Sequence, residues 1–240
     1  MFHVKHFSDF LPIFRRNGLH CPDAQFKQLE RYAGYLLEWN QKVNLISRKD
    51  EENVWTGHVL HSVSPLFRVD LPETLNALDL GSGGGLPGIP LAILREGWSV
   101  VLMDSIQKKC TAVADILDRL ELSGRVSVVC GRAEEKGVLA KLAGKFDLVL
   151  ARGVAPLSDL VRWSRPYLKK GQKGSISEQM GRHYQLTPPA LLAYKGGDLE
   201  DEIRQMQIKA RADVSAAIPL VFDGSDAMGL LEKKLIVVMP

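Results

Sequence analysis

The most informative segment of the chain is residues 76–90, which read Asn-Ala-Leu-Asp-Leu-Gly-Ser-Gly-Gly-Gly-Leu-Pro-Gly-Ile-Pro. The segment predicts a short buried strand over residues 76–80, a glycine turn over residues 81–85, and a helix that starts around Pro87 and Pro90. Proline is tolerated in a first helical turn because the N–H groups there lack intrahelical partners. The glycines leave the turn without Cβ atoms, so a ligand can approach the backbone closely. Together these features predict a ligand-binding loop at the carboxyl end of a parallel sheet.

Composition and charge are those of an ordinary globular protein. The 240 residues are 45% hydrophobic and 25% charged, which is enough to bury a substantial core. The 31 Lys and Arg residues against 28 Asp and Glu residues give a net charge of +3, which permits nucleic-acid binding without demanding it. We expect no membrane segment, because no apolar run approaches the roughly 18 residues of a membrane span.

Cysteine usage and the N-terminal sequence favour a cytoplasmic protein. Cys21, Cys110 and Cys130 are widely spaced and form no C-x-x-C pair, so we expect neither a disulfide framework nor a structural zinc site. The first residues lack the features of a secretory signal peptide. Because the charge is modest and coiled-coil repeats are missing, a monomer is the default expectation.

The chain changes character near residue 70. Before it, apolar residues at three- and four-residue steps predict a helix over residues 22–46, followed by a second helix over residues 50–66. We therefore expect a small helical subdomain over residues 1–70 and an α/β domain over residues 71–240. In the latter, strands are predicted over 76–80, 98–104, 126–130 and 146–151, alternating with helices over 87–95, 106–121 and 156–168. Such alternation is typical of a doubly wound parallel sheet.

The last third of the chain is less regular. Residues 169–189 are polar and rich in turn-forming residues, and they predict a loop or an insertion. A fifth strand is expected over residues 191–197, followed by a charged helix over residues 199–210. Two further strands, over residues 215–222 and 233–239, would form a C-terminal hairpin.

Two cofactors are compatible with the glycine turn. Its residues contain the dinucleotide-binding pattern Gly83-x-Gly85-x-x-Gly88, and Asp104 follows about 20 residues later, where an acidic residue would bind a ribose. Alternatively, Asp79 at the end of the strand starts the pattern Asp-x-Gly-x-Gly-x-Gly, which is typical of methyltransferases that use S-adenosylmethionine. The predicted C-terminal hairpin also suits the methyltransferase fold, so we favour S-adenosylmethionine.

Three residues after the other strands are candidates for contacts with such a cofactor. Asp104 would accept hydrogen bonds from the two ribose hydroxyls, or it would cap the helix that follows it. Glu134 follows the third strand and would frame the adenine together with Ala133, or it would be a carboxylate at a helix start. Arg152 follows the fourth strand, where cofactor and acceptor would meet, or it would form a structural ion pair.

Polar residues of the first quarter have similar alternatives. Asn40 and Asn44 would bond to the glycine loop or to an acceptor, or their amides would satisfy backbone groups. His58 and His61 lie three residues apart, but without a third ligand they do not predict a metal site.

Several segments resemble the ribosomal RNA small-subunit methyltransferase G family, formerly called glucose-inhibited division protein B. The resemblance covers most of the chain. It is strongest in Trp39-Asn40 to Asn44-Leu45, Asp79 to Pro90, Gly131-Arg132-Ala133-Glu134, and Ala151 to Ala155, with support from Lys108-Lys109 and Lys195-Gly196-Gly197.

The resemblance implies a fold, a reaction and a set of contacts. The fold would be a seven-stranded, Rossmann-like class I methyltransferase sheet with a small N-terminal helical subdomain. The reaction would transfer a methyl group from S-adenosylmethionine to N7 of one guanine in 16S ribosomal RNA or the small ribosomal subunit. By the resemblance, the cofactor contacts would fall on Gly81, Leu86, Asp104, Ser105, Ile106, Ala133, Glu134 and Arg152. The loop pattern itself adds Asp79, Ser82 and Gly83 as candidates for cofactor binding. Independently of the resemblance, RNA affinity is expected to come mainly from Lys and Arg contacts to phosphates, and the candidates are Arg48, Lys108, Lys109 and Lys195.

The chain also departs from the family pattern. Gly57 and His61 stand where the family usually has an arginine and an aspartate, and Leu86 replaces a frequent aromatic residue. The stretch of residues 172–189 is longer than expected. Two rival functions remain open at this point, namely an NAD-dependent oxidoreductase and an RNA-binding module without catalytic activity.

Guanine N7 places few chemical demands on an enzyme. It is an unprotonated lone pair at neutral pH and needs no general base. Catalysis would therefore consist mostly of positioning, with Arg152, Asn40 and Asn44 as the positioning candidates and no certain catalytic residue.

Overall fold

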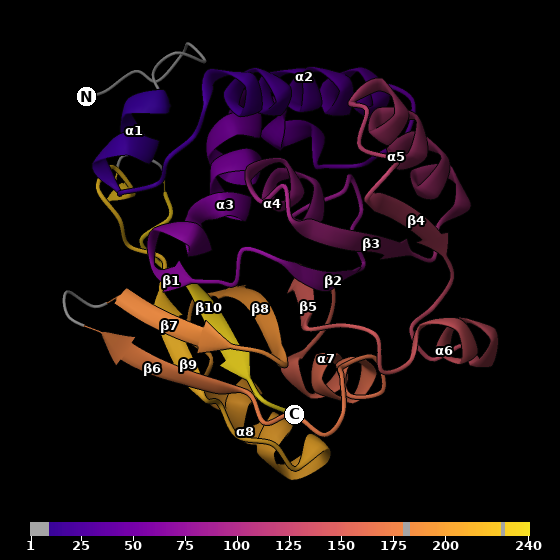
Figure 1. Ribbon diagram of the computed structural model, residues 1–240, viewed down its shortest axis with the longest axis vertical. Helices are drawn as coiled ribbons and strands as arrows, with labels where there is room; N and C mark the ends of the chain where they lie inside the picture. The colour runs from indigo at the N-terminus through magenta and orange to yellow at the C-terminus, as the bar shows by residue number, and fades with distance from the viewer. Residues whose placement is uncertain (1–9, 180–182, 227–228) are drawn as a thin grey trace.

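A central sheet of seven strands organises the computed structural model, which describes residues 10–179, 183–226 and 229–240 (Figure 1). Its strands are β2 (Leu75–Leu80), β3 (Trp98–Asp104), β4 (Val126–Cys130), β5 (Leu148–Arg152), β8 (Ala190–Gly196), β9 (Ala216–Pro219) and β10 (Lys233–Val238). The spatial order is β4-β3-β2-β5-β8-β10-β9. The first five strands in this order pair in parallel, whereas β10 is antiparallel to both of its neighbours. The carboxyl ends of β2 to β5 therefore share one edge, and the predicted strands and C-terminal hairpin are confirmed.

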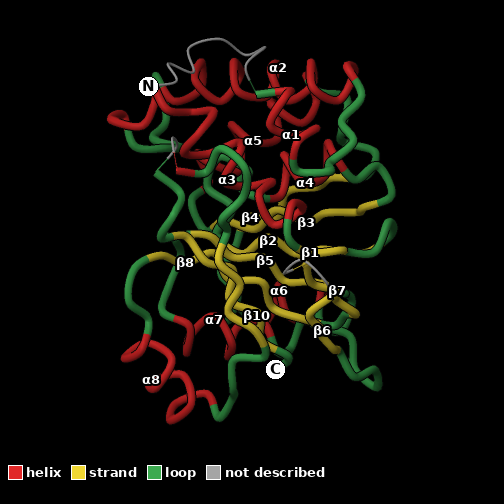
Figure 2. The backbone as a smooth tube through the Cα atoms, turned by 90° about the vertical axis from the view of Figure 1, so that its left-hand side faces the viewer, coloured by secondary structure: helices red, strands yellow, loops and turns green. Residues whose placement is uncertain are grey.

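Helices cover both faces of this sheet (Figure 2). The longer ones are α2 (Asp23–Asn40), α4 (Gly88–Leu94), α5 (Gln107–Arg119), α6 (Lys136–Leu142), α7 (Leu157–Ser164) and α8 (Glu200–Ala210), and α1 (Leu11–Arg16) precedes them. Alternate residues of each strand point to opposite faces, so Ala77 and Leu148 join one apolar core and Leu78 and Val149 join the other. The first core includes residues of α2, α4 and α5, and the second includes residues of α6, α7 and α8.

The prediction of a loop or an insertion over residues 169–189 missed two strands in this segment. Residues Ser175–Gln179 (β6) and His183–Thr187 (β7) form an antiparallel pair, and the short strand β1 (Val69–Asp70) adds to β7 in parallel. Most side chains of β6 and β7 are polar and exposed, with Leu186 buried. Residues His183–Thr187 nevertheless alternate polar and apolar side chains, and Tyr184 and Leu186 pack with Ile176 against the first core. This short strand signal was missed because the residues around it are polar and rich in turn formers.

The predicted helix over residues 22–46 ends earlier than expected, at Asn40. The N–H groups of Lys42 and Val43 both bond to the carbonyl of Trp39, which closes the helix in a tight turn. The side-chain oxygen of Asn40 then accepts hydrogen bonds from the N–H groups of Leu45 (2.8 Å) and Ile46 (2.9 Å). These local bonds compete with helix continuation and redirect the chain.

A series of short helical turns replaces the single helix predicted over residues 50–66. They are η2 (Arg48–Asn53), the π-helical turn η3 (Val54–Leu60), α3 (His61–Val63) and η4 (Ser64–Phe67). The carbonyls of Gly57 and His58 each accept a hydrogen bond from the Arg152 guanidinium at 3.3 Å. A distant side chain thus takes part in the bonding of this segment, and turns of this kind are frequent at functional sites.

The predicted division of the chain between residues 70 and 71 remains a prediction. Helix α2 packs on α4, α5 and η3, and its buried residues belong to the same core as one face of the sheet. Trp39 adds a polar contact to this packing, because its indole N–H donates to Asp115 Oδ2 of α5 at 2.7 Å.

Candidate functional site

The glycine loop lies between β2 and α4 at the carboxyl edge of the sheet. Gly81, Gly83 and Gly85 have φ values of +66°, +56° and +87°, in the left-handed region that only glycine adopts at little cost. A Cβ on Gly84 would lie 2.6 Å from Leu36 Cδ1 of α2, and the Tyr32 hydroxyl of the same helix donates to the Gly84 carbonyl at 2.9 Å. The loop is therefore held tightly against the N-terminal helices.

The N–H groups of this loop are largely used inside the protein. Gly88 N–H donates to Asp79 Oδ2 at 2.8 Å, and Gly83 N–H donates to Asp104 Oδ2 at 3.0 Å. Two further loop N–H groups, of residues 85 and 86, bond to the carbonyl of Ser82. These four N–H groups are therefore not available to the carboxylate of a bound cofactor. The same bonds weigh against a dinucleotide, whose pyrophosphate needs free N–H groups there.

A first pocket of about 180 Å³ opens beside the loop over the ends of β3 and β4. Its lining residues are Leu80, Gly81, Met103, Asp104, Ser105, Gly131, Arg132, Ala133, Glu134, Val154 and Trp163. The structure thus brings together Gly81, Asp104, Ser105, Ala133 and Glu134, as the sequence predicted. Ile106, which directly follows Ser105, is an exposed apolar residue with 48% accessibility.

Sequence reasoning did not identify Val154 and Trp163 as lining residues of the first pocket. Val154 lies within one of the segments that resemble the family, so the sequence could have identified it as a site residue. Trp163 belongs to α7, on the far side of the following loop, and nothing in its sequence neighbourhood points to the pocket.

Asp104 accepts hydrogen bonds from two backbone N–H groups, although the N-cap residue of α5 is Ile106. Its Oδ1 accepts the N–H of Ile106 at 2.9 Å, at the start of α5, and its Oδ2 accepts the N–H of Gly83. Its carboxylate also lines the first pocket. Because each carboxylate oxygen has two lone-pair sites, both oxygens can accept a further hydrogen bond from a ligand.

A second pocket, of about 170 Å³, lies on the other side of the loop and shares Gly81 with the first. It is lined by Leu45, Ile46, His58, Gly81, Ser82, Gly83, Gly84, Leu86, Lys109, Arg152 and Gly153. The predicted cofactor residues Ser82, Gly83, Leu86 and Arg152 meet here. Asp79 lines neither pocket, because its side chain is fully buried beneath the loop.

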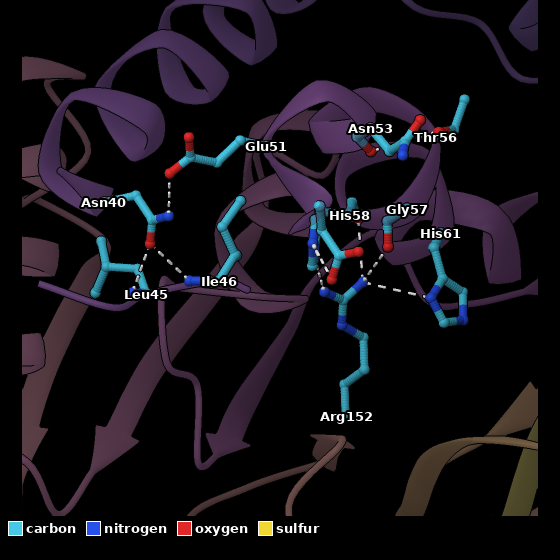
Figure 3. Close-up of polar contacts among 11 residues, drawn as sticks. Asn40, Leu45, Ile46, Glu51, Asn53, Thr56, Gly57, His58, His61 and Arg152 are labelled. Atoms are coloured by element: carbon cyan, nitrogen blue, oxygen red, sulfur yellow. Dashed lines mark hydrogen bonds and ion pairs between the residues drawn. The ribbon is translucent and has the colours of Figure 1, made fainter. Parts of the chain in front are cut away.

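Arg152 and Lys109 are the cations that line the second pocket, and two histidines contact the guanidinium of Arg152 (Figure 3). Its Nη2 lies 2.6 Å from Nδ1 of His58, and its Nη1 lies 3.4 Å from Nδ1 of His61. The carbonyls of Gly57 and His58 complete the set. No carboxylate pairs with Arg152 among the residues that the structure describes, so the structural ion pair considered for it is not seen there.

The two histidines act as neutral acceptors. Burial and, to a smaller extent, the nearby Arg152 charge lower the pKa of His58 to about 4 and that of His61 to about 3. Each Nδ1 therefore accepts from the guanidinium. His58 Nε2 lies 3.8 Å from Asp50 Oδ2, which is too long for a hydrogen bond. Across the described ranges, no group of three or more metal-ligating side chains is found.

The remaining predicted residues lie in different settings. Asn40 satisfies backbone N–H groups and donates to Glu51 Oε1 at 2.7 Å, whereas Asn44 is exposed. Lys195 pairs with Glu202 and donates to the Ala155 carbonyl at 2.8 Å, so its ammonium is already engaged in the fold. Lys108 is exposed and lines none of these pockets.

Substitution of Gly88 by alanine is expected to lower the free energy of unfolding by about 1–3 kcal/mol, the usual cost of overpacking a core. The added methyl group would lie 2.4 Å from Leu102 Cδ2 and 2.8 Å from Asp79 Oδ2. Urea unfolding measures the change. The matched control is Gly34→Ala in α2, where nothing lies within 4 Å and a gain of about 0.5–1 kcal/mol is expected. Equal effects of the two substitutions would contradict this packing.

The buried carboxyl of Asp79 predicts a pH dependence. Burial raises the pKa of Asp79 from 3.8 to about 7, so the folded protein binds this proton more tightly than the unfolded chain. The contribution of Asp79 to stability therefore falls as pH rises from about 4 to about 7 and is level above that. Asp79→Asn keeps an acceptor for Gly88 and removes the titration. The free energy of unfolding of Asp79→Asn minus that of the parent should be about 2–3 kcal/mol larger at pH 8 than at pH 5. Urea unfolding of both proteins at the two pH values measures this difference. A pH-independent difference would contradict this assignment.

The fold and the site are those of a class I S-adenosylmethionine-dependent methyltransferase. The sheet has the corresponding strand order with an antiparallel β10, and two pockets meet at the loop after β2. The family model of rRNA small subunit methyltransferase G matches residues 25–224. The chain belongs to this family. The predicted family, fold class, enzyme class and cofactor, S-adenosylmethionine, are thereby confirmed, and the dinucleotide alternative is set aside.

Curated relatives agree with the family match. The rRNA small subunit methyltransferase G of Chlorobium luteolum is 40% identical over 188 residues, which are 78% of this chain and 69% of that protein. The protein of the same name from Porphyromonas gingivalis is 34% identical over 194 residues, which are 81% of this chain and 80% of that protein.

Solved structures share the fold at low sequence identity. The mitomycin 7-O-methyltransferase MmcR has a TM-score of 0.53 and 13% identity, with 80% of this chain and 58% of that chain covered. The Methanococcus jannaschii fibrillarin pre-rRNA processing protein has a TM-score of 0.51 and 11% identity, with 73% and 72% covered. Within the described part of the chain, no helix is both long and apolar enough to cross a membrane.

Proposed function

We propose that this chain transfers the methyl group of S-adenosylmethionine to N7 of a guanine in 16S ribosomal RNA. The observation that carries the proposal is the meeting of two pockets at Gly81, one lined by Asp104 and the other by Arg152. Such a pair of pockets can hold the nucleoside of the cofactor on one side and its reactive end on the other. Family membership supports the choice of ribosomal RNA as the substrate.

We propose that the nucleoside occupies the first pocket. The Asp104 carboxylate would accept hydrogen bonds from the ribose hydroxyls, and Ala133 and Glu134 would border the adenine. The exposed side chains of Ile106 and Val154 offer apolar surface for the flat ring.

The methionyl end of the cofactor would extend past Gly81 towards Arg152. Since four N–H groups of the glycine loop are used internally, the guanidinium is the natural partner of the methionyl carboxylate. Neutral histidines leave the positive charge of Arg152 uncompensated, which favours an anion at this position.

The chemistry of the second pocket fits a nucleophile that is already unprotonated. Its histidine, His58, uses Nδ1 to accept from Arg152, so the remaining Nε2 carries the proton and cannot act as a general base. Guanine N7 needs none. The contribution of this chain would be to hold the cofactor and the base in line, which is worth about 7–11 kcal/mol in favourable cases.

Transfer of a labelled methyl group tests the proposal. Small ribosomal subunits, assembly intermediates and naked 16S RNA, each prepared without the modification, are incubated with the protein and labelled S-adenosylmethionine. Label recovered as 7-methylguanine in one of these substrates is the expected result. Cofactor binding without incorporation into any of them would favour an RNA-binding module that has lost activity.

We further propose that the protein is a cytoplasmic monomer and that it uses no metal cofactor. Residues 1–70 would form a helical subdomain, and residues 71–240 would form the methyltransferase domain. The support is the modest net charge of +3 and the family's ribosomal substrate. Light scattering after gel filtration measures the mass in solution, and a mass of two chains would contradict the monomer.

A further inference from the structure

An outer groove leads away from the second pocket along the segment after α2. Its volume is about 440 Å³, and it is lined by Asn44, Leu45, Ile46, Ser47, Arg48 and Lys109. Three of these residues, Leu45, Ile46 and Lys109, also line the second pocket. The outer groove and the pocket with Arg152 are thus neighbouring parts of one surface.

The outer groove is positively charged. Arg48 is exposed at the start of η2, and the half-buried Lys109 lies in the first turn of α5. Neither side chain forms an ion pair with a carboxylate within the described residues, whereas several other cations of this protein do. Two unpaired cations on one groove predict an anionic ligand.

The backbone of the outer groove is held in place from behind. The Asn40 side chain accepts the N–H groups of Leu45 and Ile46, and its own amide donates to Glu51 of η2 (Figure 3). Asn40 is buried, with 1% exposure. The wall that carries Asn44 and Arg48 is therefore shaped before any ligand binds.

We propose that the outer groove binds the sugar-phosphate backbone of the RNA strand beside the target base, with Arg48 and Lys109 on its phosphates. This inference rests on the proposed function. A flexible strand that places one base in the second pocket must continue along the adjoining surface, and the outer groove is large enough for a nucleotide. Asn44 adds an exposed amide that can donate to and accept from a base edge. Asn40 is a positioning residue, because it acts through the backbone of the wall.

The test uses the full-length protein and the variant Arg48→Ala, with Arg31→Ala as the matched control. Arg31 is an exposed cation of α2 outside all the pockets described above, so both variants lose one charge. Methyl transfer to the substrate that the labelling experiment identifies is measured between 50 and 300 mM salt. Affinity for S-adenosylmethionine is measured by calorimetry, and affinity for a fluorescent single-stranded RNA is measured by anisotropy.

Arg48→Ala is expected to raise the KM for RNA about tenfold and to leave kcat and cofactor affinity unchanged. The slope of log affinity against log salt should become shallower by about 0.7, the value for one phosphate contact on a single strand. Arg31→Ala should behave as the parent protein. Asn40→Ala should also raise KM but keep the parent salt slope, because it removes no charge.

Two outcomes separate the inference from the proposed function. Equal KM values and salt slopes for Arg48→Ala and Arg31→Ala would overturn the groove assignment, while methyl transfer by the parent would uphold the enzyme. If the parent transfers no methyl group but Arg48→Ala still lowers RNA affinity and the salt slope, the proposed reaction fails and the groove assignment stands.

Discussion

Replacing Arg152 by lysine is expected to lower kcat/KM for methyl transfer by about 10- to 100-fold and to leave the protein folded. The guanidinium reaches two carbonyls and two ring nitrogens at once, and a lysine ammonium cannot match this planar arrangement. Hydrogen bonds to charged groups are worth about 1.5–3 kcal/mol each, so the loss of one in the reacting complex gives a change of this size. Initial rates at saturating and limiting cofactor measure it.

The stability of Arg152 variants supplies the control. Arg152→Ala removes the side chain from four partly buried hydrogen-bond acceptors, and we expect the free energy of unfolding to fall by about 3 kcal/mol. Circular dichroism and urea unfolding of the lysine variant separate lost fold from lost positioning. If the lysine and alanine variants bind S-adenosylmethionine and transfer methyl groups as the parent does, Arg152 has no role in the reaction.

Replacing Asp104 by alanine is expected to weaken S-adenosylmethionine binding about 100-fold. The proposed contacts are charge-assisted hydrogen bonds to two ribose hydroxyls, and two such bonds at about 1.5 kcal/mol each account for this factor. The substitution also frees the N–H groups of Gly83 and Ile106, which should lower stability by about 1–2 kcal/mol, as the loss of a helix cap does. Calorimetric titration with the cofactor measures the affinity.

Two variants bracket the effect of Asp104. Asp104→Asn keeps one acceptor oxygen and should weaken binding about tenfold, since it loses the charge but not the shape. Asp159→Ala removes a half-exposed carboxylate of α7 that pairs with Arg162 and should leave cofactor affinity unchanged. If Asp104→Ala binds S-adenosylmethionine as tightly as the parent does, Asp104 does not bind the cofactor and only accepts the backbone N–H groups of Gly83 and Ile106.

The histidine at position 61 changes how Arg152 is held. An aspartate, which the resemblance places at this position in the family, would give Arg152 a charged partner. In this chain His61 is buried and neutral, and its Nδ1 lies 3.4 Å from the guanidinium. The charge of Arg152 is therefore left for a ligand, at the cost of burying a cation without a carboxylate.

Local sequence was sufficient for most of the α/β domain. Largely apolar runs identify β2, β3 and β5 because a strand buried on both faces has no polar face. The edge strand β4 is only partly buried and is identified by its valines. The glycine loop was equally readable, since positive φ at Gly81 and Gly83 and the close approach at Gly84 exclude other side chains. These signals depend only on neighbouring residues.

What the sequence by itself determined is the order of strands and helices, the glycine loop, and the placement of Asp104 and Arg152 at one edge of the sheet. Tertiary structure alone decided the partners of these side chains. Arg152 meets His58 across 94 positions of the chain, and Tyr32 meets Gly84 across 52. It also decided the pairing of β6 with β7, because the short alternation of Tyr184 and Leu186 does not specify which segment β7 pairs with. The physical reason is that propensity and periodicity act over a few residues, whereas pocket walls and charge environments arise from contacts between distant segments.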